Sequence, residues 1–124
     1  MSLIVKICGL STPETLDAAL AAGADMVGFV FFPPSPRHVD PASAAALGGS
    51  VAGRAKTVAP TVDADDTLLA RIVETLRPDL LQLHGKESVA RLRDIKQTFG
   101  LPVMKALPVE TAADLAALPG YAAV

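Results

Sequence analysis

The chain has 124 residues with a hydrophobic content of 51%, which suits a single folded domain over residues 1–124 and excludes a disordered chain. Its net charge of -2, its 11 scattered basic residues and the lack of an apolar run of roughly 18 residues argue against nucleic acid and membranes as partners. A single cysteine cannot form an internal disulfide, so the composition predicts a reducing, cytoplasmic environment.

Short apolar segments alternate with Ala- and Leu-rich segments along the chain. This pattern predicts strands at residues 3–8, 26–32, 55–63, 79–85 and 102–108. It predicts helices between and after them, at residues 13–22, 41–47, 65–76, 87–99 and 110–118. Local signals support the boundaries: Thr12 and Pro13 begin the first helix, Gly23 ends it, and Asp65 and Asp66 begin the third.

Three details of the pattern carry expectations of their own. Pro60 lies inside the third strand, which indicates a bulge or an irregular strand end. Gly48 and Gly49 follow the second helix and predict a turn. The last residues, 121–124, follow a Pro-Gly pair and are interpreted as the beginning of a sixth strand.

Alternation of strands and helices predicts βαβ units and a parallel α/β sheet. The strands are apolar on both faces, as expected for a sheet that helices cover. Two architectures fit, an open doubly wound sheet and part of a (β/α)8 barrel. The length suits the first and is well short of the roughly 200 residues of a whole barrel. In both, ligands bind at the carboxyl ends of the strands.

Three strand ends or loops carry residues that could do chemistry. Cys8 ends the first strand on the same face as Lys6, where an ammonium would favour the thiolate, although a buried core thiol is the alternative interpretation. Arg37 lies in a proline-stiffened loop, either as a binding group for a carboxylate or phosphate or as a solvated arginine. His84 and Gly85 end the fourth strand.

The acidic residues and histidines predict no metal site. Asp65 and Asp66 are explained by helix capping and the helix dipole, and His38 and His84 are too far apart in the sequence to be interpreted as a ligand pair. A Walker A or GxGxxG phosphate loop is also absent from the sequence.

A receiver-type signalling domain is a further alternative for the doubly wound architecture. Asp63 and Lys105 match the aspartate and lysine that such a domain has after its third and fifth strands. However, Cys8 stands where the family has a Mg²⁺-binding acidic pair, and His84 stands where it has Ser or Thr.

Three segments together resemble the phosphoribosylanthranilate isomerase family of tryptophan biosynthesis. They are KICGL (6–10), GADMVGFVFFPPSPRHV (23–39) and LLQLHG (80–85), in the family's order and spacing. The resemblance implies a (β/α)8 TIM barrel, of which this chain would hold about five and a half βα units. It implies an Amadori rearrangement of a small-molecule substrate, phosphoribosylanthranilate, with no cofactor.

The resemblance also implies roles for individual residues. Cys8 would be the general base, Arg37 would bind the anthranilate carboxylate, and His84 and Gly85 would line the pocket. The family's general acid is an aspartate on the sixth strand, expected beyond Val124, so we expect the chain as given to be inactive. The alternative is a non-catalytic half-barrel that associates through its open edge, as a homodimer or with a separate C-terminal half.

Overall fold

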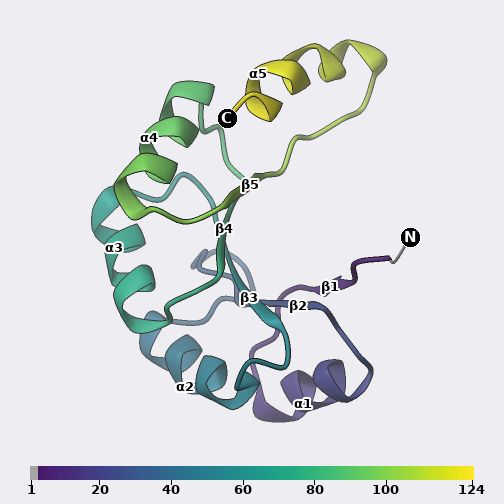
Figure 1. Ribbon diagram of the computed structural model, residues 1–124, viewed down its shortest axis with the longest axis vertical. Coiled ribbons are helices and arrows are strands. Elements are labelled where there is room, and N and C mark those ends of the chain that lie inside the picture. Colours follow the sequence, from purple (N-terminus) through teal and green to yellow (C-terminus); the bar gives the residue numbers. More distant parts are fainter. Residues whose placement is uncertain (1–2) are drawn as a thin grey trace.

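The computed structural model describes residues 3–124 and shows an α/β structure built on one parallel sheet (Figure 1). The strands are β1 (Lys6–Ile7), β2 (Met26–Gly28), β3 (Lys56–Thr61), β4 (Leu80–Leu83) and β5 (Val103–Lys105). The helices are α1 (Pro13–Ala21), α2 (Pro41–Val51), α3 (Asp66–Thr75), α4 (Val89–Phe99) and α5 (Leu118–Ala122), with the 3-10 helix η1 (Ala112–Ala117) before α5. The predicted alternation is therefore confirmed through β5.

The order of the strands decides between the two architectures. The strands lie in chain order, β1-β2-β3-β4-β5, and every neighbouring pair is parallel. In Figure 1 helices α1 to α4 follow one another along the convex side of the curved sheet. A doubly wound sheet instead reverses its strand order at a switch point and carries helices on both faces. The arrangement is that of a (β/α)8 barrel, so the receiver-type alternative is wrong.

The hydrophobic core lies between the sheet and the four helices. Val27, Phe29 and Phe31 project from β2 and its continuation and are almost completely buried. Their partners are the buried side chains of the helices, such as Leu16 of α1 and Leu69 of α3. Each such side chain contributes about 1.5–3 kcal/mol to folding, so this layer holds the strand ends in place.

Local capping signals explain where the helices begin. The Thr12 side chain accepts a hydrogen bond from the Thr15 N–H (3.2 Å), and Asp65 accepts one from the Leu68 N–H (2.8 Å). Ser88 caps α4 in the same way through Arg91. Such caps stabilise a helix by about 1 kcal/mol, and they depend only on nearby residues.

The first strand is shorter than predicted. Of residues 3–8 only Lys6–Ile7 pair regularly, because the Val5 N–H donates to the Asp25 side chain (2.8 Å). Leu3 and Ile4 precede this point and are 84% and 65% exposed.

Within residues 3–124 no helix is both long and apolar enough to cross a membrane.

The expectations for the glycine pair and for Pro60 had different outcomes, and the expected turn at the glycines is wrong. Gly48 and Gly49 do not form a turn but continue α2. A Cβ on Gly48 would lie 2.6 Å from the Leu76 side chain, so the glycine lets α2 approach the end of α3. Pro60 causes no bulge, because the register of β2 against β3 is the same on both sides of it. The strand end is irregular instead, since the ladder stops at Val58 and only an isolated bridge between Phe31 and Thr61 follows. The Pro60 carbonyl still accepts a hydrogen bond from the Phe31 N–H (3.0 Å).

The predicted sixth strand is also wrong. Residues 118–122 form α5, with Pro119 in the first turn, where a proline is tolerated because that N–H has no helical partner. The predicted helix at 110–118 is replaced by the 3-10 helix η1 followed by α5. Tyr121 turns its hydroxyl toward the Glu87 carbonyl and donates a hydrogen bond to it (2.6 Å).

Candidate functional site

A cavity of about 150 Å³ lies at the carboxyl edge of the sheet. Cys8, Arg37 and His84 line it, together with apolar side chains that include Val30 and Phe32. The fold therefore brings together three residues that lie far apart in the sequence. A cation beside apolar walls suits a ligand that carries both an anionic group and an apolar part.

Cys8 is half-buried and reaches this cavity, so it is not a core thiol. Gly28 on β2 lies directly beneath it. A Cβ on Gly28 would lie 3.3 Å from Cys8 Sγ and 3.5 Å from Lys6 Nζ. The thiol and the ammonium therefore converge on the same glycine, as the strand alternation predicts, and the missing side chain leaves room for both.

Arg37 is positioned by its own loop and by Gly9. The Arg37 N–H donates to the Ser35 hydroxyl (3.2 Å), within a turn that the Ser35 N–H closes onto the Phe32 carbonyl (2.9 Å). The side chain then runs over Gly9, where a Cβ would lie 2.5 Å from Arg37 Cδ. Gly9 also has a positive φ of 78°, so it is required both for its backbone conformation and for this close contact.

His84 is held through its backbone, whose N–H donates to the Thr61 carbonyl (2.9 Å). Burial lowers the pKa of the His84 imidazole, and the positive charge of Lys6 lowers it further. The carboxylate of Glu87 acts in the opposite direction. Because the pKa lies below its usual range, the ring is neutral near pH 7 and can either donate or accept a hydrogen bond.

Gly85 does not line the cavity but packs against Asp63. A Cβ on Gly85 would lie 2.5 Å from the Asp63 carboxylate, which accepts a hydrogen bond from the Lys86 N–H (2.8 Å). Asp63 itself has a positive φ of 48°. Among residues 3–124 the structure assembles no cluster of three His, Cys, Asp or Glu side chains that could hold a metal ion.

Comparison with known proteins identifies the family. A family model described as N-(5'-phosphoribosyl)anthranilate (PRA) isomerase matches residues 5–121. The chain belongs to the phosphoribosylanthranilate isomerase family. The N-(5'-phosphoribosyl)anthranilate isomerase of Nitrobacter hamburgensis is 74% identical over 124 residues, which are all of this chain and 55% of the relative. The chain thus spans about half the length of the curated relatives it matches.

Solved structures of phosphoribosylanthranilate isomerases confirm the fold. One, in complex with reduced 1-(o-carboxyphenylamino)-1-deoxyribulose 5-phosphate, superposes with a TM-score of 0.90 at 28% identity. The match covers 97% of this chain and 61% of that one. A structure of monomers of the dimeric isomerase from Thermotoga maritima gives 0.85 at 29% identity, over 93% of this chain and 58% of that one. The resemblance in the three sequence segments therefore predicted the family and the TIM-barrel fold correctly.

Sequence reasoning missed Glu87, whose charge acts on the His84 imidazole. Its position was interpreted as the start of an ordinary helix, yet its side chain is only 3% exposed and forms an ion pair with Lys105. Lys105 was considered as a strand-end residue and as a match to the lysine of a receiver-type domain. The available signal was weak, since an acidic residue after a strand resembles a helix-capping residue.

Proposed function

We propose that this chain is the N-terminal part of a phosphoribosylanthranilate isomerase of tryptophan biosynthesis, with residues 1–124 forming a single domain of the barrel. The reaction is the Amadori rearrangement of N-(5-phosphoribosyl)anthranilate to 1-(o-carboxyphenylamino)-1-deoxyribulose 5-phosphate, without a cofactor. The observation that carries the proposal is the convergence of Cys8, Arg37 and His84 on one cavity at the carboxyl edge of the sheet. A relative bound to the reduced form of this product supports it.

The reaction needs an acid and a base at different atoms. Protonation of the ribose ring oxygen breaks its bond to C1′ and gives a Schiff base. Removal of the C2′ proton then gives an enolamine, which tautomerises to the ketone. We assign the removal of the C2′ proton to the Cys8 thiolate. Arg37 binds the anthranilate carboxylate, His84 completes the pocket wall, and Gly85 belongs to the turn that supports His84.

The acid of this reaction is assigned outside the chain as given. The resemblance places it on an aspartate of the sixth strand, beyond Val124, whereas residues 118–122 are helical. Asp63 is a poor substitute, because its carboxylate is already engaged by the Lys86 N–H. We therefore expect residues 1–124 alone to show little or no turnover.

A chimera tests the assignment. Residues 1–124 are joined to the remaining C-terminal part of the Nitrobacter hamburgensis relative, and turnover of phosphoribosylanthranilate is measured for the chimera and for its Cys8→Ala variant. We expect activity in the chimera and a loss of at least about a hundredfold in the variant, the scale of a general base. An inactive but folded chimera would contradict the proposed function. An active Cys8→Ala variant would contradict only the assignment of Cys8 as the general base.

A second candidate function, association of the half-barrel through its open edge, is favoured by the exposure of Leu3 and Ile4 beside β1. An apolar strand edge pairs readily with another chain. The T. maritima relative is described as dimeric, which makes a homodimer one form of this candidate and pairing with a C-terminal half the other. Sedimentation of residues 1–124, alone and mixed with the C-terminal part of the Nitrobacter hamburgensis relative, distinguishes the homodimer from the pairing with a C-terminal half. A monomer under both conditions would count against association.

A further inference from the structure

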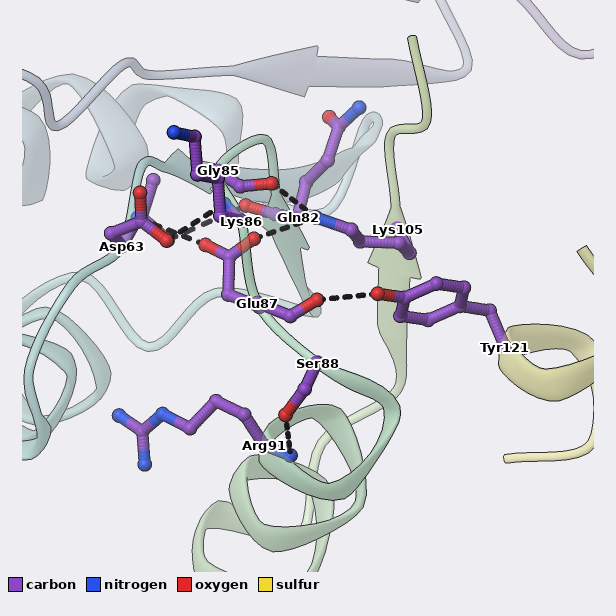
Figure 2. A network of polar contacts seen from close by, with 10 residues as sticks. Asp63, Gln82, Gly85, Lys86, Glu87, Ser88, Arg91, Lys105 and Tyr121 are labelled. Carbon is purple, nitrogen blue, oxygen red and sulfur yellow. Dashed lines mark hydrogen bonds and ion pairs between the residues drawn. The ribbon is translucent and has the colours of Figure 1, made fainter. Parts of the chain in front are cut away.

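A buried ion pair joins the end of β5 to the turn between β4 and α4. Glu87 Oε1 and Lys105 Nζ are 2.7 Å apart, and their side chains are only 3% and 6% exposed (Figure 2). Burying two charges costs several kcal/mol of desolvation, and such a pair often stabilises a protein no better than apolar residues would. Its presence therefore calls for a role other than stability.

Both members of the pair have further partners in neighbouring loops. The second oxygen of Glu87 accepts a hydrogen bond from the Asp63 N–H (2.9 Å), after β3. The Glu87 carbonyl accepts from the Tyr121 hydroxyl, and Lys105 at the end of β5 also donates to the Gly85 carbonyl. Figure 2 shows these bonds meeting around Glu87. Glu87 thus joins the ends of β3, β4 and β5.

The turn that carries His84 is held from two sides by this network. On one side, the Asp63 carboxylate accepts from the Lys86 N–H while the Asp63 N–H donates to Glu87. On the other side, Lys105 binds the carbonyl of Gly85, the residue next to His84. Because His84 is anchored through its backbone, the position of its ring follows the position of this turn.

We propose that Glu87 and Lys105 are positioning residues for His84. The two residues hold the turn after β4 against the ends of β3 and β5, and this fixes the His84 imidazole in the cavity wall. The proposal rests on the proposed function for its catalytic meaning, but the geometry can be tested without any turnover.

The charges around His84 give the proposal a specific signature. The groups that act on it are Lys6 from β1, Arg37 from the loop after β2, Glu87 before α4 and Lys105 from β5. Glu87 raises the pKa of the imidazole, whereas Lys105 lowers it. Loss of one partner or the other should therefore shift the titration of His84 in opposite directions.

The first test is an NMR titration of His84 in the full 124-residue chain, with the signal assigned through a His84→Asn variant. We expect the pKa of His84 to fall in Glu87→Gln and to rise in Lys105→Met. A pair with a merely structural role would loosen the fold in both variants and move the pKa toward its usual value in both. Shifts of the same sign, or none, would overturn the proposal.

The second test separates local from global loosening by amide hydrogen exchange. Glu87→Asp keeps the charge but shortens the side chain, so it cannot span Asp63 and Lys105. We expect exchange at the His84 amide to accelerate at least about tenfold, with the Phe29 amide in the core unchanged. The matched control Glu74→Asp, on the exposed face of α3, should change neither.

A milder variant covers the case in which the Glu87 and Lys105 substitutions do not fold. Tyr121→Phe leaves the ion pair intact and removes only the hydrogen bond to the Glu87 carbonyl. Faster exchange at His84 with Phe29 unchanged would support the proposal. Equal acceleration at both amides, or at neither, would overturn it. Failure of the proposed function would show separately, as an inactive chimera with these exchange and titration results intact.

Discussion

The guanidinium of Arg37 lies against the backbone of Gly9, so closely that a Cβ on Gly9 would come within 2.6 Å of Arg37 Nη1. Gly9 directly follows Cys8, so two neighbouring residues each place one group of the site, the thiol and the guanidinium. The first carries the thiol to the cavity, and the second leaves room for the cation above it. This contact explains why a glycine belongs after the cysteine in KICG.

Gly9→Ala should displace Arg37 and raise KM in the chimera at least about tenfold, because a charge-assisted hydrogen bond to the substrate carboxylate is worth about 1.5–3 kcal/mol. Gly23→Ala is the matched control, since Gly23 also has a positive φ, 87°, but no atom lies within 4 Å of its Cβ position. Both variants should lose about 1–3 kcal/mol of stability through backbone strain. Equal KM values in the two variants would show that Gly9 acts through the backbone alone.

Gly85→Ala should destabilise the chain by about 1–3 kcal/mol, because its Cβ would meet the Asp63 carboxylate at 2.5 Å. Gly49→Ala, in open space on α2, should instead be neutral or stabilise by about 0.5–1 kcal/mol. Urea unfolding measures both free energies. Asp63→Ala should relieve part of the cost in the double variant. A cost that is independent of Asp63 would contradict the contact.

Lys6→Met should raise the pKa of His84, because burial and then the Lys6 charge lower it. In the folded chain the depressed pKa keeps the imidazole neutral, so its stabilising contribution is present above about pH 6.5 and is lost as the pH falls below that value. Lys6→Met should reduce this loss in urea unfolding curves between pH 7 and 5. Lys56→Met, at the amino end of β3, serves as the control and should leave the His84 titration unchanged.

Acid should weaken the fold through Glu87. Burial raises the pKa of this carboxyl, but hydrogen bonds from Lys105 and from the Asp63 N–H outweigh it, and the net shift is downward. A depressed carboxyl pKa stabilises the fold above the unfolded value of about 4.5, and that contribution is lost as the pH falls further. Glu87→Gln should flatten the unfolding free energy below pH 4.5. An unchanged acid profile in this variant would show that protonation of Glu87 is not what weakens the fold in acid.

Local features of the structure could be predicted because their causes are local. Thr12 and Asp65 were expected to begin helices, and each does so through an N–H three residues away. The placement of Lys6 and Cys8 on one face follows from the two-residue period of a strand. Predictions failed where a distant residue was involved. Gly48 lies inside α2 and leaves room for Leu76, and Glu87 is the partner of Tyr121 in the helix that replaced the expected strand.

The sequence by itself determined the alternation of strands and helices, the helix starts, the family, and the candidacy of Cys8, Arg37 and His84. Only the tertiary structure decided the strand order, the contact of Arg37 with Gly9 and the burial of Glu87 against Lys105. The physical reason is the distance along the sequence between the residues that interact. Caps and strand periodicity depend on residues a few positions apart, whereas a cavity wall or a buried ion pair depends on which strand ends the packed sheet brings together.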